Sequence, residues 1–289
     1  MSTQDALAAD FEQQRPHLRA VAYRMLGSVS EAEDAVQEAW LRLSRTDTTE
    51  VDNLAAWLTT VVSRVCLDQL RSRRSRREDS LEVRLPDPVV TPVDIDPRSD
   101  PEQQALVADA VGLALLVVLE ELNPAERLAF VLHDMFGLPF ADIAPIVDRS
   151  TDATKMLASR ARRRVQGART VPDPDLSRQR QAVDAFQAAA RAGDFDALLE
   201  VLDPDVVLRA STAEGLRVVR GAAAVASGAV MFQQMALSAR PVLVNGVAGV
   251  AASAEGRLYS VAAFTVVDGR IVGIDIISEP DRLRLLDVP

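Results

Sequence analysis

The chain has 289 residues, 48% of them hydrophobic, and a formal net charge of −10. This composition predicts roughly two folded domains and excludes a chain that is disordered throughout. The longest uncharged apolar run, residues 110–119, is too short for a membrane span, which needs about 20 residues. The N-terminus is acidic and lacks the apolar segment of a secretion signal, so we expect a soluble, cytoplasmic protein.

Metal sites and disulfides are not expected. Cys66 is the only cysteine, and His17 and His133 are the only histidines. A single cysteine forms no internal disulfide, and a Cys/His zinc site needs more ligands than these. We therefore expect no metal and no cofactor.

Residues 10–80 carry the pattern of three helices. Apolar residues recur at helical spacing until Gly27 ends the pattern. Ser30 followed by Glu33 predicts a capping box at the start of a second helix. A third helix is expected from about Leu54 into a cluster of arginines.

A proline-rich segment follows these helices. Residues 84–101 hold five prolines, which predicts an extended linker that cannot be helical. Residues 102–167 return to a helical pattern, with a helix start at Asn123-Pro124 and a break at Gly137.

After Pro174 the pattern is α+β. Two helices are expected over residues 175–202, split at Gly193. Strand-like runs follow, with a helix near 222–235 between them; the runs are 206–209, 242–247, 258–267 and 271–277. Asp268-Gly269 predicts a type I′ hairpin between the last two runs.

Residues 139–166 carry the pattern of a helix-turn-helix. Asp148-Arg149 form a short turn, and Ser150 or Thr151 caps the helix that follows. On that helix one narrow stripe is suited to burial: Thr154, Ala158, Ala161 and Val165. Another face is polar and basic, as expected of a helix that reads the major groove of DNA. The alternative is an ordinary helical hairpin with a basic exposed face.

Arginines gather in two clusters despite the negative total charge. They lie within residues 71–77 and 160–169, each at the end of a helical module. Local basic patches bind phosphate even on an acidic protein, so the clusters favour a nucleic-acid partner. The alternative for each cluster is a solvated helix end.

Three stretches resemble bacterial RNA polymerase sigma factors. SEAEDAVQEAWLRL (30–43) is similar to region 2.2, and residues 55–74 are similar to regions 2.3–2.4. Residues 121–165, which end in RARRRV, are similar to region 4. This is the two-domain layout of the extracytoplasmic-function (ECF) family, with a linker in place of region 3.

The C-terminal part resembles a SnoaL-like (NTF2-like) domain, as in the SigJ-like subgroup of the ECF family. That subgroup has an LPxP linker motif and a C-terminal NPDKL-type motif, which here read LPDP (85–88) and EPDRL (279–283). The resemblance implies that these motifs form a regulatory contact between domains, through Pro86, Glu279, Pro280, Asp281 and Arg282.

The resemblance also implies roles for single residues. A ridge on the 30–43 helix would bind core polymerase: Asp34, Gln37 and Glu38. A polar loop and the helix after it would open the −10 promoter element: Asn53, Trp57, Arg64, Asp68, Arg71 and Arg74. The second helix of the helix-turn-helix would bind the −35 element: Thr151, Asp152, Lys155, Met156, Ser159, Arg160 and Arg163.

Catalysis is not expected. SnoaL-like enzymes place Asp or His residues in the cone, and residues 175–289 contain no histidine. The carboxylates Asp205, Glu214 and Asp275 are candidates by type only, because none has a second partner at a defined spacing. A hydrolase or cyclase with accessory helices is therefore a weaker alternative.

We predict a multidomain chain of two all-α sigma domains and an α+β NTF2-like cone. The expected boundaries are region 2 at 8–80, a linker at 81–102, region 4 at 103–170 and the regulatory domain at 175–289. The expected function is an ECF sigma factor that the C-terminal domain regulates in cis. Its expected partners are promoter DNA and the β′ clamp and β flap of core polymerase, with a small ligand of the C-terminal domain as a further candidate. The alternative is a one-component helix-turn-helix regulator whose NTF2-like domain binds an effector.

Overall fold

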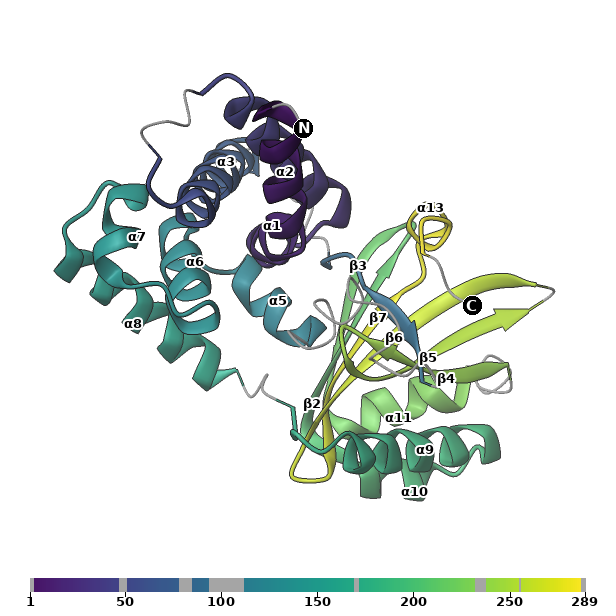
Figure 1. Cartoon of the computed structure of the whole chain (residues 1–289). Coiled ribbons are helices and arrows are strands. Elements are labelled where there is room, and N and C mark those ends of the chain that lie inside the picture. Colours follow the sequence, from purple (N-terminus) through teal and green to yellow (C-terminus); the bar gives the residue numbers. More distant parts are fainter. Residues whose placement is uncertain are drawn as a thin grey trace. The chain divides into compact units, whose positions relative to one another are not determined.

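The computed structural model of the protein describes residues 3–46, 51–77, 85–93, 112–168, 172–231, 238–254 and 256–286. The chain divides into two compact units (Figure 1). The helical unit comprises Met1–Leu81 and Val118–Val165, and the sheet unit comprises Glu82–Val117 and Gln166–Pro289. Within the described ranges, no helix combines the length and hydropathy that crossing a membrane requires.

Three long helices form the first part of the helical unit. They are α1 (Thr3–Leu26), α2 (Val29–Leu43) and α3 (Leu54–Arg77). α1 ends where expected, because Gly27 adopts the left-handed backbone conformation with a φ of 69°. Leu18, Ala35 and Leu58, one from each helix, are completely buried.

The predicted capping box of the second helix is wrong. Ser28, not Ser30, is the N-cap of α2, and its side chain makes no capping hydrogen bond. The extended backbone of Ser28 (φ −128°, ψ 131°) places Ser30 inside the first turn of the helix. Glu33 instead lies 2.8 Å from Arg19 of α1, so it supports packing between the two helices.

Shorter helices complete the helical unit. They are the last turn of α5 (Leu113–Glu120), α6 (Pro124–Phe130), a π-helical turn η2 (Val131–Met135), α7 (Phe140–Val147) and α8 (Thr151–Gly167). The predicted start at Pro124 is confirmed, and the Asn123 side chain accepts a hydrogen bond from the Ala125 amide at 3.4 Å. The break at Gly137 is also confirmed, with a φ of 71°.

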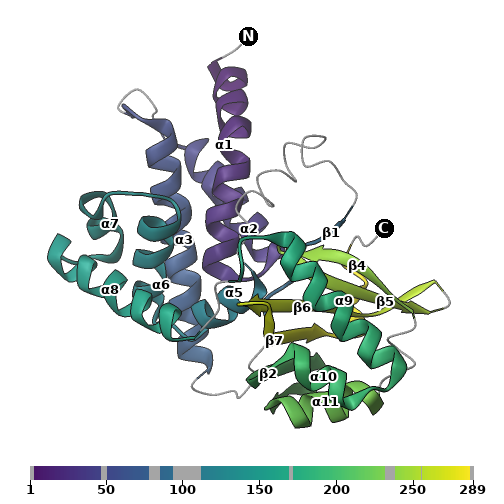
Figure 2. The same ribbon diagram turned by 90° about the horizontal axis from the view of Figure 1, so that it is seen from below.

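The sheet unit has helices on one face of a seven-stranded sheet. The helices are α9 (Leu176–Ala192), α10 (Phe195–Val201) and α11 (Ala222–Met231), seen together in Figure 2. The strands are β1 (Val90–Pro92), β2 (Leu202–Thr212), β3 (Gly215–Arg220), β4 (Ala239–Val244), β5 (Val247–Ala254), β6 (Arg257–Val267) and β7 (Arg270–Ile277). Their common core includes Val183, Leu198, Val225 and Phe264. This is the α+β architecture expected of an NTF2-like domain.

The sheet order is β1-β4-β5-β6-β7-β2-β3. β2 pairs with β7 in parallel, and all other pairs are antiparallel. The predicted hairpin at Asp268-Gly269 is confirmed by φ values of 53° and 76°. The helix split at Gly193 is also confirmed, because Gly193 is left-handed and Asp194 caps α10.

Two parts of the sheet differ from the sequence prediction. The run 242–247 is not one strand, because Asn245-Gly246 has positive φ values of 51° and 72° and turns the chain from β4 into β5. The proline-rich segment is not only a linker, because Val90–Pro92 adds strand β1 to the edge of β4. The Asn245 side chain accepts a hydrogen bond from the Val89 amide at 2.9 Å, which anchors this strand.

Candidate nucleic-acid interface

The helix-turn-helix has the predicted local geometry. α7 ends at Asp148, whose left-handed backbone (φ 57°, ψ 54°) turns the chain toward α8. The Ala153 amide donates a hydrogen bond to the Ser150 hydroxyl at 3.2 Å, so Ser150 caps α8. Phe140, at the start of α7, stacks on His133 with ring centroids 3.7 Å apart.

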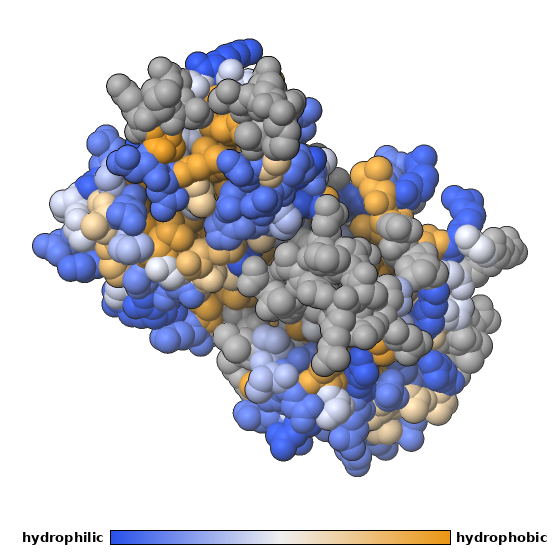
Figure 3. All heavy atoms as spheres, viewed as in Figure 1, coloured by the Kyte–Doolittle hydropathy of each residue, from blue (hydrophilic) through white to orange (hydrophobic). Residues whose placement is uncertain are grey.

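The two faces of α8 divide as predicted. Its buried residues are Thr154, Ala158, Ala161 and Val165. Asp152, Lys155, Met156, Arg160 and Arg163 are exposed, whereas Thr151 and Ser159 are partly exposed. Figure 3 shows mainly hydrophilic side chains along the edge where α8 lies. A side chain as apolar as Met156 at 59% exposure has no internal packing role there.

The arginines of α8 fall into two groups. Arg162 donates a hydrogen bond to Asp134 at 2.7 Å, which raises the pKa of its guanidinium. Arg164 pairs with Glu126 at 3.2 Å. By contrast, Arg163 donates a hydrogen bond to a neutral acceptor, the Ser159 carbonyl, at 3.4 Å. The second basic cluster is therefore partly internal, and Arg169 of that cluster lies outside the described residues.

Lys155 is held loosely at the start of α8. It forms an ion pair with Asp152 at 3.1 Å, and the two side chains are 56% and 91% exposed. A pair this exposed contributes little to folding, about 0–1 kcal/mol. Both side chains are therefore accessible to a ligand of this helix face.

The −10 candidates share one face of α3. Arg64, Asp68, Arg71 and Arg74 are all exposed, and Trp57 is partly exposed. Asn53 has a structural task as well, because its side-chain oxygen accepts a hydrogen bond from the Ala56 amide at 3.0 Å and caps α3. The side chains of Arg76 and Arg77 lie outside the described residues.

The core-polymerase candidates line an exposed ridge on α2. Asp34 and Gln37 are exposed, and Glu38 pairs with Arg42 at 2.9 Å. Gln37 also borders a cavity of about 300 Å³, together with Phe11 and Trp40. The ridge thus combines acidic and polar groups with a neighbouring cavity whose lining is both apolar and charged.

Arg127 joins the two parts of the helical unit, and the sequence analysis did not single it out. It is 1% exposed, and its Nε and Nη2 donate hydrogen bonds to the Arg24 carbonyl at 3.1 and 3.0 Å. Its Nη1 forms an ion pair with Glu120 at 2.8 Å. Region 4 residues are therefore bound to the C-terminal end of α1. The main partner of Arg127 is a backbone carbonyl 103 positions away in the chain, which no local sequence pattern marks.

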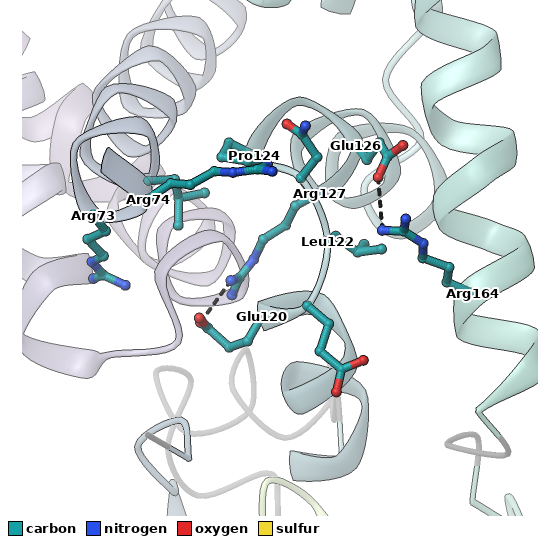
Figure 4. A pocket seen from close by; sticks show the side chains of 11 residues that line it. Arg73, Arg74, Glu120, Leu122, Pro124, Glu126, Arg127 and Arg164 are labelled. Carbon is teal, nitrogen blue, oxygen red and sulfur yellow. Dashed lines mark hydrogen bonds and ion pairs between the residues drawn. The ribbon is translucent and has the colours of Figure 1, made fainter. Parts of the chain in front are cut away.

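A cavity of about 340 Å³ lies beside this contact (Figure 4). Its charged walls are mixed in sign: Arg73, Arg74, Arg127 and Arg164 with Glu120, Glu121 and Glu126. Figure 4 shows two of these arginines engaged by glutamates, Arg127 by Glu120 and Arg164 by Glu126.

Cys66 is buried, and burial raises the pKa of its thiol to about 12, so the thiol stays protonated at neutral pH.

The LPDP (85–88) and EPDRL (279–283) segments meet inside the sheet unit. Arg282, only 5% exposed, donates from Nη2 to the Leu85 and Pro86 carbonyls, each at 2.8 Å, and to the Asp87 carboxylate at 2.9 Å. Its Nη1 lies 3.3 Å from Glu279. A buried guanidinium thus binds the LPDP segment to α13 (Pro280–Leu283).

The acidic residues of the C-terminal motif have partners within their own unit. Glu279 accepts a hydrogen bond from the Ser211 hydroxyl, and Asp281 pairs with Arg284. The sequence offers the basic clusters at 71–77 and 160–169 as candidate partners of Glu279, Asp281 and Asp287. The contacts of Glu279 and Asp281 are of another kind, and Asp287 lies outside the described residues.

The three carboxylates considered for catalysis lie in different settings. Asp275 on β7 is buried and pairs with Arg209 of β2 at 3.2 Å; burial raises the pKa of its carboxyl. Asp205 is exposed, and Glu214 lies at the β2–β3 turn, where it accepts a hydrogen bond from Thr212. Among the described residues, no group of three His, Cys, Asp or Glu side chains could hold a metal ion.

Comparison with known families matches both helical modules. Residues 11–76 match sigma-70 region 2, and residues 112–165 match sigma-70 region 4. The chain is 41% identical to the ECF RNA polymerase sigma factor SigJ of Mycobacterium tuberculosis, over 95% of this chain and 92% of that protein. It is 36% identical to the probable ECF sigma factor SigI of the same species, over 98% of this chain and 97% of that protein.

A solved structure extends the likeness to the whole fold. The crystal structure of M. tuberculosis SigJ matches with a TM-score of 0.78 and 36% identity, covering 98% of this chain and 100% of that one. A helix-turn-helix module and a second helical module, joined to an α+β domain, define the class as a transcription initiation factor. The chain belongs to the ECF family of RNA polymerase sigma factors. Proteins of this family bind core RNA polymerase and promoter DNA, and sigma factors are generally not enzymes.

Proposed function

We propose that the two helical modules recognise the two promoter elements separately. Region 2, residues 8–80, binds the −10 element, and region 4, residues 103–170, binds the −35 element. Residues 81–102 connect them, and residues 175–289 regulate them in cis. The protein acts in the cytoplasm and catalyses no reaction of its own.

The division of α8 into two faces carries the −35 proposal. A helix whose buried face is limited to small residues leaves its opposite face free for the major groove. Thr151, Asp152, Lys155 and Met156, in the first turns, are placed to read bases. Ser159, Arg160 and Arg163, further along, are placed to hold phosphates.

The exposed face of α3 supports the −10 proposal. Arg64, Arg71 and Arg74 supply positive charge along one side of the helix, and Asp68 lies among them. Asn53 and Trp57 lie at its N-terminal end, where an unstacked base would be held. Because Asn53 caps α3 through its oxygen, its amide nitrogen is the group offered to the base.

The ridge on α2 is proposed to bind the β′ clamp of core polymerase, while region 4 binds the β flap. Asp34, Gln37 and Glu38 provide an acidic-polar surface that suits a basic partner. Replacing Gln37 and Glu38 together with alanine should reduce binding to core polymerase. The melting temperature should change little, because exposed substitutions usually shift stability by less than about 0.5 kcal/mol.

Reconstituted transcription with purified core polymerase tests the function itself. The full chain should direct initiation from a cognate promoter. Lys155→Ala should relax the base preference at one position of the −35 element. Arg163→Ala should instead weaken binding to all DNA sequences alike, and should lower the slope of log affinity against log salt concentration by about one. Specific DNA binding without any transcription would favour the one-component regulator instead. Equal loss of discrimination in both variants would contradict the proposed orientation of α8.

Regulation in cis is proposed to act through the contact between the two motifs. Pro86 contributes a carbonyl to it, Pro280 starts α13, and Arg282 joins them, with Glu279 and Asp281 at its edges. The contact joins the linker, which connects the two promoter-binding modules, to the rest of the sheet unit. A conformational change in the sheet unit would therefore alter the conformation of the linker. A small ligand of the sheet unit is one such change.

A further inference from the structure

A basic groove is formed where the two parts of the helical unit pack together. Its volume is about 470 Å³, within the range of about 300–1,000 Å³ typical of small-molecule sites. α3 contributes Arg71, Arg74 and Ser75, the start of α6 contributes Asn123, Pro124 and Ala125, and the turn before α8 contributes Arg149. No acidic residue is among these lining residues, unlike the adjacent cavity of Figure 4.

The three arginines of this groove are only weakly neutralised. Arg71 pairs with Asp68 at 3.7 Å, and both side chains are more than half exposed. The Nη1 of Arg149 donates to the Asp148 carbonyl at 2.8 Å, which is a neutral acceptor. Arg74 is exposed and borders both cavities. Three arginines thus line the groove, and the contacts described for them include a single ion pair, which is exposed.

We propose that this basic groove binds the phosphate chain of a small polyphosphate. Guanidinium groups bind phosphate oxygens in bidentate geometry, and a ligand with several phosphates offers enough acceptor oxygens for arginines from two separate elements. A nucleotide and an inorganic polyphosphate present the same chemistry. The size of the groove suits either one.

Such a ligand would select the packed form of the helical unit. The groove has two walls only while region 4 residues are held against region 2, a contact that Arg127 makes through the Arg24 carbonyl. A ligand that binds one state better shifts the population toward it. The bound ligand would also occupy Arg71 and Arg74. The resulting inhibition of transcription rests on their proposed −10 role, but binding itself does not.

Isothermal titration calorimetry on the full chain, without polymerase or DNA, tests the binding. Tripolyphosphate, ATP, adenosine and orthophosphate are the probes. Tripolyphosphate should bind, orthophosphate should bind far more weakly, and adenosine should not bind. ATP binding tighter than tripolyphosphate would identify a nucleotide, and the reverse would identify inorganic polyphosphate.

Matched variants decide whether the groove is the site. Arg71→Gln and Arg149→Gln should each weaken tripolyphosphate binding by on the order of tenfold, the cost of one charge-assisted contact. Arg178 of α9 is also exposed and also pairs with an aspartate, so Arg178→Gln is the control and should not change tripolyphosphate binding.

Three results would overturn the proposal. Unchanged binding in Arg149→Gln would mean that α3 acts alone. An equal loss in Arg178→Gln would mean that binding follows total charge. Dependence on Arg71 and Arg149 for a short DNA duplex but not for tripolyphosphate would make the groove part of the DNA path. Failure of the −10 proposal would appear separately, as normal transcription by Arg71→Gln without polyphosphate.

Discussion

Arg127 and Arg42 each pair with a glutamate of the helical unit, but their side chains are 2% and 46% exposed. Burial determines what such a pair does to stability. Removing one partner of a buried pair leaves the other charge without compensation, whereas an exposed pair is replaced by water. The two arginines therefore form a matched experiment on one domain.

Arg127→Met should lower the free energy of unfolding by about 3–5 kcal/mol, and Arg42→Met by less than about 1 kcal/mol. Urea denaturation followed by tryptophan fluorescence measures the unfolding of the helical unit specifically, because Trp40 and Trp57 are the only tryptophans and both lie in that unit. Comparable losses in the two variants would show that Arg127 is not a buried anchor.

Asp275→Asn should raise the melting temperature at pH 7.5, and the gain should shrink as the pH falls toward 4. Burial raises the pKa of Asp275 above its ordinary value despite Arg209, so the folded state holds the proton more tightly than the unfolded chain. The stability due to that proton is complete below the ordinary pKa and is lost as pH rises through the folded pKa. Calorimetry across this range checks the prediction. Asp281→Asn, at an 88% exposed carboxylate, is the control and should show no such trend.

At the scale of single residues, the sequence predicted what depends on local spacing. The buried stripe of α8 was predicted fully, because helical geometry alone places Thr154 and Ala158 on one face. The partner of Arg127 was not predictable, because it is a backbone carbonyl far away in the chain. The pairing of Arg162 with Asp134 was not predictable either, because the two residues are 28 positions apart in the chain.

At the scale of elements, the turn of the helix-turn-helix holds a strained residue. Asp148 adopts a left-handed conformation in which only glycine avoids a steric cost. Asp148→Gly should stabilise the helical unit by about 0.5–1 kcal/mol, and Asp148→Val should destabilise it by at least about 1 kcal/mol. Tryptophan fluorescence in urea measures both changes, and −35 binding by the glycine variant should be retained. A loss of stability in Asp148→Gly would mean that the aspartate side chain itself supports the turn.

Element prediction succeeded where a stop signal was recognised and failed where one was overlooked. Gly27, Gly193 and Asp268-Gly269 ended elements as expected. Asn245-Gly246 is an equally strong hairpin signal, but it was included in a strand because valines flank it. Strand β3 was missed because none of its residues is buried, so its sequence has no apolar alternation.

At the scale of the whole molecule, the linker is part of a folded domain. Arg282→Ala should release residues 85–93 from the sheet unit, because it removes donors to Leu85, Pro86 and Asp87 together. Limited proteolysis should then cut this segment faster, and promoter output should change. Arg284→Ala, which removes an exposed pair with Asp281, is the matched control. Equal protease sensitivity in the two variants would show that Arg282 does not anchor the linker.

Composition predicted an extended linker, and its strand could not be predicted because β1 is completed by a partner far away in the chain. Val90 lies opposite Val244, and hydrogen bonds join Val89 to Asn245 in both directions. The domain order and the α+β class were predictable from the order of elements. That the linker residues belong to the sheet unit was not predictable from the sequence.

If the two helical modules bind the two promoter elements as proposed, strand β1 has a consequence for promoter choice. At about 3.1 Å per extended residue, residues 85–93 account for about 28 Å of the linker between the proposed −10 and −35 modules, and docking fixes the direction and length of this part. The sheet unit would thus restrict the length of the spacer between the −10 and −35 elements. With β1 docked, promoters with one spacer length are favoured. With β1 released, longer spacers are tolerated. A series of promoters that differ only in spacer length would read the state of this strand directly from transcript yields.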